Sequence, residues 1–528
     1  MVKRIFWTLA LAGALVAVHP YSAYAAEGDN AADHARSEQK DTTPVPKEDA
    51  SVTHGSVEIG GRTVHYTATA GNLVIRNDKG EPDASIFYVA YTADDKGAAR
   101  KRPVTFLYNG GPGSSSIWLH MGSFGPVRIA TADGEATPPA PYRVVPNHQS
   151  MLDKTDLVFV DAIGTGFSEA VGKAKNKDFW GTDQDVDSFG RFIQRYITVN
   201  HRWDSPKFLY GESYGTTRSA ALAAHLQDMG IALNGVTLMS SILNYGVLMP
   251  GSDMRYELYL PTYAAIAFYH HKLPNQPAQI GPFLDEVRHF ADTDYAKALA
   301  QGDTLPAAEA DSIAQKLHQY TGLSVEYLKR ANLRVDASRF RKELLRDEAR
   351  TVGRYDGRFM GIDEDSVGDT PDYDASDTAV SAAFTAAFNA YLDGTLKYKH
   401  DRPYKVMAGA IREWDWKHQA PGSRRKLPMP YVAGDLARAM RENPGLRVFS
   451  ANGWFDLATP FHVTEYDIDH MQLDPTLRSH VSFGYYPSGH MIYLHPAALK
   501  SLKHDLDTFY DDTLSVSASA PATAAAAN

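Results

Sequence analysis

The sequence predicts an α/β fold in which a mostly parallel central sheet is interrupted by a large helical insertion. The first observation is a series of short apolar segments of strand length, several separated by helix-patterned sequence, at 104–108, 157–160, 208–210, 236–239, 447–449 and 481–483. Strands separated by helices require parallel crossover connections. The second observation is the stretch 246–425, which is helix-patterned, rich in Tyr, Arg and Ala, and poor in strand signals.

These signals also predict the domain organisation. We expect the α/β core to consist of residues 53–245 and 426–514, with residues 246–425 inserted as a helical cap. Residues 26–52 are polar with almost no large apolar groups, which is typical of a disordered leader. Residues 515–528 are a low-complexity tail of Ser, Ala, Pro and Thr.

The first residues predict export. Lys3 and Arg4 precede the apolar segment 5–18, and small residues stand before Ala26, which is the pattern of a signal peptide over residues 1–25. A retained membrane anchor is the alternative interpretation. No later stretch is apolar enough to span a bilayer, so we expect no membrane association after cleavage, and a periplasmic or secreted protein.

Composition excludes some functions and favours one compartment. The 528-residue chain has a net charge of −10, which becomes −12 without residues 1–25, so we expect no nucleic acid partner. It contains no cysteine and therefore no disulfide, which fits a bacterial periplasm or exterior better than a eukaryotic secretory route. The acidic stretch 363–377 lacks the spacing of a calcium loop, with Val367 at a ligand position. We expect no metal and no cofactor.

The segment Gly211-Glu212-Ser213-Tyr214-Gly215 carries the clearest chemical signal. An apolar strand at 208–210 leads into a serine with glycine two residues away on each side, and helix-rich sequence follows. This is the pattern of a nucleophile elbow, a strand-to-helix turn so sharp that only small residues fit at its flanks.

A serine nucleophile needs a base and an acid that orients the base, and in this type of sheet both follow the serine in the chain. Asp456 lies in the loop after the strand near 448, at the end of the sheet where α/β sites form. His490 follows the strand near 482 and a glycine. Among the 20 histidines we prefer His490 as the base over its rivals, which are His462, His480 and His495.

The segment 109–116, Asn-Gly-Gly-Pro-Gly-Ser-Ser-Ser, follows the strand 104–108. Glycine amides in such a loop can approach a ligand closely and stabilise developing negative charge. An ordinary Gly/Pro turn is the alternative.

Together these residues resemble the serine carboxypeptidase family of α/β-hydrolases. The resemblance rests on the blocks 109–116, 161–168 and 211–214, completed by Asp456 with Pro460 and by Gly489-His490-Met491. It extends from about residue 110 to 490 and does not obviously match the helical insertion. It implies Ser213 as nucleophile, His490 as general base and acid, and Asp456 as the partner that orients His490.

The resemblance also implies two binding sets. The amides of Gly111 and Tyr214 would form the oxyanion hole, and Asn109, Glu212 and the amide of Gly110 would hold the free carboxylate of the last substrate residue. Glu212 could do so only when protonated, because two carboxylates close together cannot both stay ionised cheaply. We assign residues 161–168 a structural role.

The chain departs from the family pattern at several positions. Ser114 stands where the family usually has cysteine, and Gly215-Thr216 followed by Arg218 replaces the usual Ala-Gly after Tyr214. Ser123 stands where family members often carry a second glutamate, which puts a preference for acidic pH in doubt.

The resulting hypothesis is an exported serine carboxypeptidase that acts on peptides with a free C-terminus through an acyl-enzyme. The first alternative is an esterase or acyltransferase of the same fold. The second is a binding protein without catalytic activity. The sequence does not define an oligomeric state.

Overall fold

The computed structural model describes residues 42–94 and 102–519, and its compact unit begins at Thr43. The predicted signal peptide, most of the predicted leader and the last nine residues of the predicted tail lie outside the described residues. Within the described ranges, no helix is both long enough and apolar enough to cross a bilayer.

The core is one ten-stranded sheet with the order β1-β2-β3-β7-β4-β9-β10-β13-β14, and β8 is paired to β3 at the side. The strands are β1 (Ala50–Ile59), β2 (Arg62–Arg76), β3 (Pro82–Ala93), β4 (Val104–Tyr108), β7 (Asp156–Val160), β8 (Glu169–Ala170), β9 (Lys207–Ser213), β10 (Gly235–Ser241), β13 (Arg447–Gly453) and β14 (Val481–Tyr486). All pairings from β7 to β14 are parallel, whereas β1, β2 and β3 form an antiparallel edge. The predicted fold class, an α/β-hydrolase fold, is confirmed.

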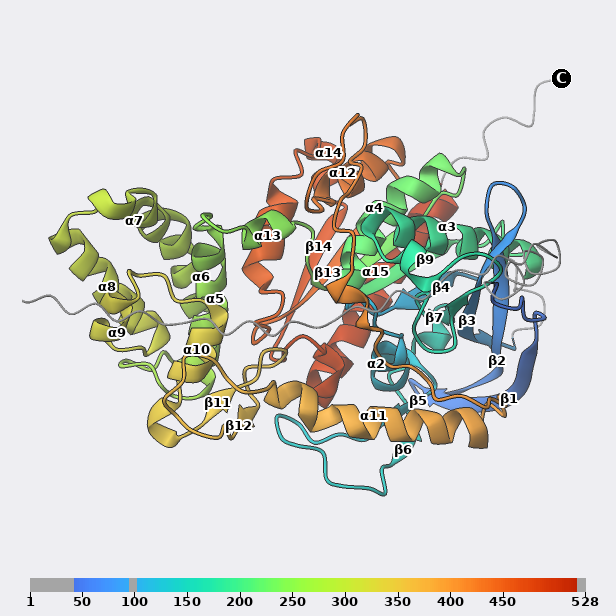
Figure 1. Ribbon diagram of the computed structural model, residues 1–528, viewed down its shortest axis with the longest axis horizontal. Helices are drawn as coiled ribbons and strands as arrows, with labels where there is room; N and C mark the ends of the chain where they lie inside the picture. The colour runs from blue at the N-terminus through green and yellow to red at the C-terminus, as the bar shows by residue number, and fades with distance from the viewer. Residues whose placement is uncertain (1–41, 95–101, 520–528) are drawn as a thin grey trace, which may run out of the picture. The chain divides into compact units, whose positions relative to one another are not determined.

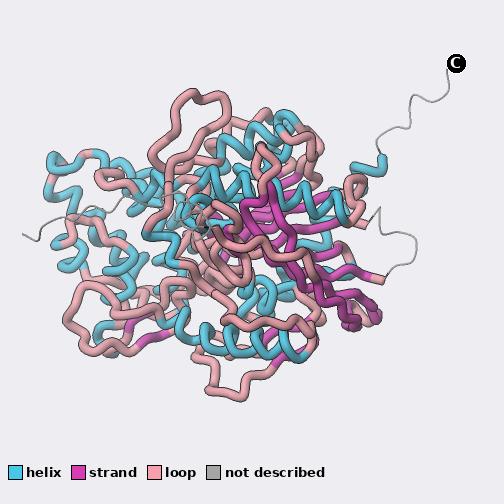
Figure 2. Tube along the Cα trace, turned by 45° about the vertical axis from the view of Figure 1, so that its right-hand side comes forward, coloured by secondary structure: helices cyan, strands magenta, loops and turns pink. Residues whose placement is uncertain are grey.

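Helices cover both faces of this sheet (Figure 2). One apolar cluster joins the strands to α3 (Thr182–Val199), α4 (Tyr214–Asp228) and α12 (Ala433–Glu442). A second cluster on the other face joins them to α2 (Ile117–Leu119), α11 (Ala375–Gly394) and α15 (Pro496–Ser519). Because both faces are buried, the central strands read as continuous apolar runs, and all five residues of β4 and of β7 are buried.

The chain between β10 and β13 contains the helical insertion, which packs around an apolar cluster of its own. Its helices are α5 (Met254–Tyr269), α6 (Ile280–Phe290), α7 (Ala296–Ala300), α8 (Ala307–Thr321), α9 (Val325–Arg330) and α10 (Ala337–Glu343). They gather beside the β13–β14 edge, opposite the edge formed by β1 (Figure 1). The cluster continues into α13 (Phe461–Asp469), which belongs to the core.

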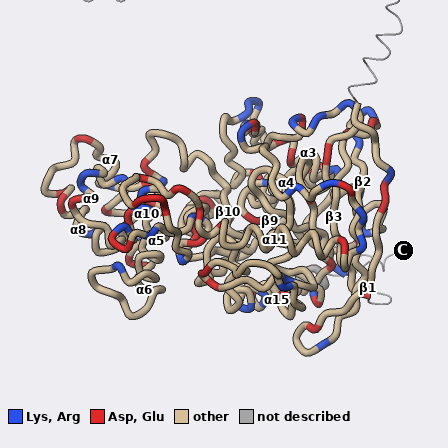
Figure 3. The backbone as a smooth tube through the Cα atoms, turned by 60° about the horizontal axis from the view of Figure 1, so that its bottom comes forward, with Lys and Arg blue, Asp and Glu red and all other residues tan. Residues whose placement is uncertain are grey.

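The remaining elements are short. Two small antiparallel sheets consist of β5 (Val127–Ile129) with β6 (Val144–Pro146) and of β11 (Thr351–Val352) with β12 (Met360–Gly361). The helix α14 (Pro475–Arg478) precedes β14. Lys and Arg are interspersed with Asp and Glu along the described backbone (Figure 3).

Two predicted boundaries differ from the structure. Residues 43–49, assigned to a disordered leader, contact the sheet: Thr43 pairs with Gly172, and a Glu48 carboxylate oxygen accepts a hydrogen bond from the Val74 amide at 2.8 Å. Glu48 also forms a salt bridge with Arg195 of α3 at 2.8 Å. The amino-acid composition of residues 43–49 does not indicate such polar contacts. It shows only that large apolar side chains are lacking. At the other end, α15 continues through residue 519, into the predicted tail.

A fully buried arginine joins α3, α4 and the loop after β4. Arg218 has no exposed surface and forms a bidentate pair with Asp185 of α3, with N···O distances of 2.7 and 3.1 Å. Its remaining terminal nitrogen donates to the carbonyl of Asn109 at 2.9 Å. The guanidinium also lies 4.1 Å from the ring centre of Phe189. Arg218, a departure from the family pattern, therefore connects the helix after Ser213 with the predicted oxyanion loop.

We predict that Asp185→Asn lowers the free energy of unfolding by about 3 kcal/mol or more, because it leaves the buried guanidinium without a countercharge. The measurement is a urea titration. The matched control is Asp187→Asn on the same helix, whose carboxylate is half-exposed and pairs with Arg191, so its effect stays below about 1 kcal/mol. Equal effects of the two changes would contradict the prediction.

Candidate active site

Ser213 lies in a turn that only glycine neighbours allow. β9 ends at Ser213 and α4 begins at Tyr214, with Ser213 itself at φ 61°, a conformation rare outside glycine. A Cβ at Gly211 would lie 2.2 Å from the carbonyl oxygen of Gly215, and a Cβ at Gly215 would lie 2.8 Å from that of Tyr108. The turn therefore has the geometry of a nucleophile elbow, as the sequence predicts.

The structure brings Asp456 and His490 together. His490 Nδ1 donates to Asp456 Oδ2 at 2.7 Å, and both side chains are buried. The other carboxylate oxygen, Oδ1, accepts from the amides of Ala458 and Thr459 at 2.8 and 3.0 Å. The Thr459 hydroxyl lies 2.7 Å from Asp456 Oδ2. This network fixes the carboxylate and selects the tautomer of His490 that carries its proton on Nδ1.

The charge of His490 depends on two opposing effects. Burial lowers the pKa of His490, but the charge and hydrogen bond of Asp456 together with the charge of Glu212 outweigh burial, so the net pKa is raised. The backbone of His490 is also fixed, because its amide donates to the carbonyl of Tyr355 at 2.6 Å and its carbonyl accepts from Ser240 Oγ at 2.6 Å. The Tyr355 ring lies 5.1 Å from the imidazole, centre to centre.

The three rival histidines lie elsewhere. His462 forms hydrogen bonds with Asp292 and Glu465, and although burial opposes its charge, these acids raise its pKa to about 9. A histidine that stays cationic at neutral pH cannot act as a general base. His495 pairs with Asp133, and His480 precedes β14 without lining the pocket of Ser213.

The predicted oxyanion loop packs directly on the elbow. A Cβ at Gly110 would lie 2.4 Å from the amide nitrogen of Tyr214 and 2.6 Å from that of Gly215, so the two backbones touch. The Tyr214 ring is buried against Trp414, with ring centres 5.3 Å apart, so only its backbone is directed toward this loop. Asp161, from the block assigned a structural role, accepts from the amide of Ser116 at 2.8 Å and so supports the loop.

Glu212 and Asn109 meet beside Ser213. Asn109 Oδ1 accepts from the Leu119 amide at 3.0 Å, which leaves the amide nitrogen of its side chain for Glu212. Tyr493 donates its hydroxyl proton to Glu212 Oε2 at 3.0 Å. Glu212 is 3% exposed, and burial raises its pKa to about 7. The positive charge of His490 and the hydrogen bonds from Tyr493 and Asn109 act in the opposite direction.

Ser123 does not contact Glu212 in the described structure. Its hydroxyl donates to the Leu119 carbonyl at 2.5 Å within the short helix His120–Phe124. The adjacent Gly122 leaves the space that the Tyr493 ring fills, since a Cβ at Gly122 would lie 2.5 Å from that ring. A tyrosine hydroxyl, rather than a second carboxyl, is therefore the partner of Glu212.

Sequence reasoning missed Tyr493, Thr459 and Tyr355. A local signal existed for the first two, because Tyr493 follows His490 by three residues and Thr459 follows Asp456 by three. No local signal marks Tyr355, which comes from the helical insertion more than a hundred residues before His490.

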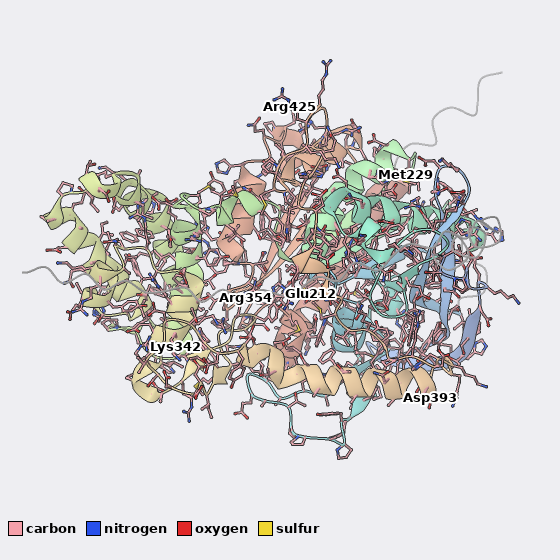
Figure 4. The ribbon with its side chains drawn as sticks, in the orientation of Figure 1. Glu212, Met229, Lys342, Arg354, Asp393 and Arg425 are labelled. Carbon is pink, nitrogen blue, oxygen red and sulfur yellow. The ribbon has the colours of Figure 1, made fainter. Side chains whose placement is uncertain are left out.

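One pocket of about 540 Å³ collects the predicted residues. It is lined by Ser213, His490, Glu212, Asn109, Gly110 and Gly111, among others. Glu212 lies at the centre of the view in Figure 4, with Arg354 of the insertion beside it. A larger pocket of about 750 Å³ lies between α6 and α13 and contains His462 instead of Ser213. Six of the eight predicted site residues thus line one cavity, Asp456 lies behind His490 and Tyr214 behind the oxyanion loop, and their catalytic roles stay predictions.

The described residues contain no group of three or more His, Cys, Asp or Glu side chains arranged to hold a metal ion. In the acidic stretch 363–377, Asp363 is buried and pairs with Lys342 at 2.6 Å. That carboxylate has a side-chain countercharge, so Lys342 holds this part of the loop.

Fold and site define an α/β-hydrolase with a serine at a nucleophile elbow and a buried His–Asp pair whose histidine lines the pocket of that serine. Residues 62–278 match the family model described as serine carboxypeptidase. This match covers 217 of the 528 residues, and over it the chain is similar to serine carboxypeptidases.

Known proteins resemble the chain over different lengths. The pheromone-processing carboxypeptidase KEX1 of Saccharomyces cerevisiae is 32% identical over 156 residues, which cover 28% of this chain and 20% of that protein. The crystal structure of KEX1(delta)p, a prohormone-processing carboxypeptidase from the same yeast, covers 85% of this chain and 92% of that one, with 15% identity and a TM-score of 0.52. This likeness shows the fold. The crystal structure of a proline iminopeptidase from Mycobacterium smegmatis covers 84% of this chain and 98% of that one, with 14% identity and a TM-score of 0.36.

We predict that Tyr493→Phe raises the pKa of Glu212, because it removes a hydrogen bond that stabilises the carboxylate while keeping the ring that packs on Gly122. Infrared pH titration, with Glu212→Gln as the reference, measures this directly. The carboxyl signal titrates near pH 7 in the parent protein and at higher pH in the variant. An unchanged or lower midpoint would refute the role given to Tyr493.

Proposed function

We propose that the protein is a serine carboxypeptidase that releases single residues from the carboxyl end of peptides. The observation that carries the proposal is the one pocket lined by Ser213, by His490 with Asp456 bonded behind it, and by the buried Glu212–Asn109 pair. The first three residues suit acyl transfer in general. Glu212 and Asn109 provide what a carboxypeptidase needs in addition, which is a set of hydrogen-bond donors for a terminal carboxylate.

In the proposed reaction, Ser213 Oγ attacks the carbonyl carbon of the last peptide bond while His490 Nε2 accepts the hydroxyl proton. Asp456 stabilises the resulting imidazolium through Nδ1. The amides of Gly111 and Tyr214 receive the negative charge that develops on the carbonyl oxygen. His490 then protonates the leaving amine, the released residue departs, and water hydrolyses the acyl-enzyme with His490 again as base.

Glu212 acts in this proposal as a protonated hydrogen-bond donor. A pKa of about 7 keeps its carboxyl neutral in the acidic to neutral range, where it can donate to the substrate carboxylate. Above that range Glu212 ionises and repels the same group. Ser123 puts a preference for acidic pH in doubt, and the burial of Glu212 supplies a separate reason for a protonated carboxyl in this range.

The test compares a blocked dipeptide with its carboxyl-amide. We expect a lower Michaelis constant for the free acid, and roughly tenfold or greater loss of that preference in Glu212→Gln and in Asn109→Ala, since hydrogen bonds to charged groups contribute about 1.5–3 kcal/mol. The Michaelis constant for the acid should rise above about pH 7, as Glu212 ionises. Equal rates on acid and amide would favour an esterase or acyltransferase.

Covalent labelling of the serine distinguishes the two enzyme hypotheses from a binding protein without catalytic activity. A serine-directed phosphonylating reagent should modify Ser213 in the wild-type protein and leave Ser213→Ala unmodified. Absence of modification at Ser213 would sink both enzyme hypotheses and favour a binding protein.

We also propose that the protein is exported. Support comes from the cationic start, the apolar segment 5–18 and the small residues before Ala26. Sequencing of the mature N-terminus in a bacterial host should give a chain that begins at Ala26 in the periplasmic or culture fraction. An intact N-terminus in the cytoplasmic fraction would overturn this proposal.

A further inference from the structure

The pocket of Ser213 contains a cation whose charge no described carboxylate neutralises. Arg354 lines this pocket together with Ser213 and Glu212, and Figure 4 shows Arg354 and Glu212 side by side. Its side chain is exposed and lies over the ring of Tyr355, with 5.3 Å between the guanidinium carbon and the ring centre. Among the described residues no Asp or Glu oxygen lies within ion-pair distance of this guanidinium. Its positive charge nevertheless reaches the site, because it lowers the pKa of His490.

The backbone around Arg354 is fixed to the loops that carry the predicted triad. The Arg354 amide donates to Asp374 Oδ1 at 2.8 Å, and the Arg354 carbonyl accepts from the Leu457 amide at 3.0 Å. The next carbonyl, that of Tyr355, accepts from the His490 amide at 2.6 Å. Arg354 therefore projects from a position that is anchored beside both Asp456 and His490.

The acids in the same pocket have other partners. Asp374 accepts from the amides of Arg354, Tyr355 and Ser376, so its oxygens cap the start of α11. Asp377 lies within the first turn of α11 and accepts from the Ser381 hydroxyl at 3.2 Å. Both carboxylates are held by these donors. The guanidinium of Arg354 forms a hydrogen bond with the Tyr355 hydroxyl, and its further donors stay available to a ligand.

We infer that Arg354 binds a carboxylate of the peptide substrate, an inference that rests on the proposed function. A guanidinium presents several donors in one plane and pairs with a carboxylate in a bidentate manner. Asn109 and protonated Glu212 supply neutral hydrogen bonds, whereas Arg354 supplies charge, which persists above the pKa of Glu212. The carboxylate is either the terminal one or the side chain of an Asp or Glu residue next to it in the peptide.

Binding to the Ser213→Ala protein tests this inference without turnover. Calorimetry compares two pairs of blocked dipeptides: a free acid against its amide, and a dipeptide with Glu against one with Gln at the first position. With Arg354 present, the charged member of at least one pair binds more tightly. For each pair, we take the ratio of the dissociation constant of the uncharged dipeptide to that of the charged one. In Arg354→Gln the ratio that exceeds one falls roughly tenfold, as expected for a lost charge-assisted hydrogen bond. A fall in the first ratio identifies the terminal carboxylate, and a fall in the second identifies the side chain.

Two controls accompany the measurement. Arg354→Lys keeps the charge and should retain part of the preference. Arg350→Gln changes an arginine four residues earlier that does not line the pocket, and should leave both ratios unchanged. Thermal unfolding verifies that each variant is folded, which the exposed position of Arg354 favours.

The inference is overturned if Arg354→Gln leaves both ratios unchanged, or if none of the four dipeptides binds when Arg354 is present. Failure of the proposed function gives a different result: the wild-type protein hydrolyses no peptide although the binding ratios still depend on Arg354.

Discussion

The site depends on one backbone contact, between the loop at Gly110 and the turn at Ser213. No side chain fits there, because a Cβ on Gly110 would lie within 2.6 Å of two amide nitrogens of the first turn of α4. The buried Arg218 holds the same contact from behind, through its hydrogen bond to the Asn109 carbonyl. Because these positions are fixed by main-chain packing and by a buried ion pair, the donors of both proposed binding sets are in place before a substrate arrives.

Within this frame, Glu212 and His490 determine each other's charge. The negative charge of Glu212 raises the pKa of His490, and the positive charge of His490 lowers the pKa of Glu212. The proposed chemistry needs a neutral imidazole and a protonated carboxyl. The alternative is an ion pair between a protonated His490 and an ionised Glu212. Both states hold one proton between the two residues, so pH alone does not select between them.

The surroundings make that selection. Tyr493 donates to Glu212 and favours the ion pair, whereas the positive charge of Arg354 disfavours the imidazolium. A substrate carboxylate bound at Asn109 would disfavour ionised Glu212 and so would promote the neutral, reactive state. Binding of the correct substrate end would therefore help to prepare the base.

Much of this architecture could be predicted from the sequence. Buried strands read as apolar runs, and the glycines around Ser213 identify the turn because no other residue fits there. Asp456 and His490 were predictable because sites in this fold form in the loops after parallel strands. Each of these signals lies within a few residues of the position it predicts.

The rest depends on contacts between distant segments. Tyr355 and Arg354 come from the helical insertion, and Arg218 pairs with Asp185 on another helix, so no local pattern indicates what they touch. The contacts of Thr43 and Glu48 with the sheet were missed for the same reason. Ser123 is a different case: the lack of a second glutamate at this position put a preference for acidic pH in doubt, whereas burial, which the sequence does not reveal, raises the pKa of Glu212.

The most direct test of the account is a time course of peptide digestion followed by mass spectrometry. One peptide is supplied both as a free acid and as a carboxyl-amide. We expect stepwise loss of single residues from the carboxyl end of the acid, a much slower loss from the amide, and no loss with Ser213→Ala. Internal cleavage, release from the amino end, or equal degradation of the two forms would contradict it.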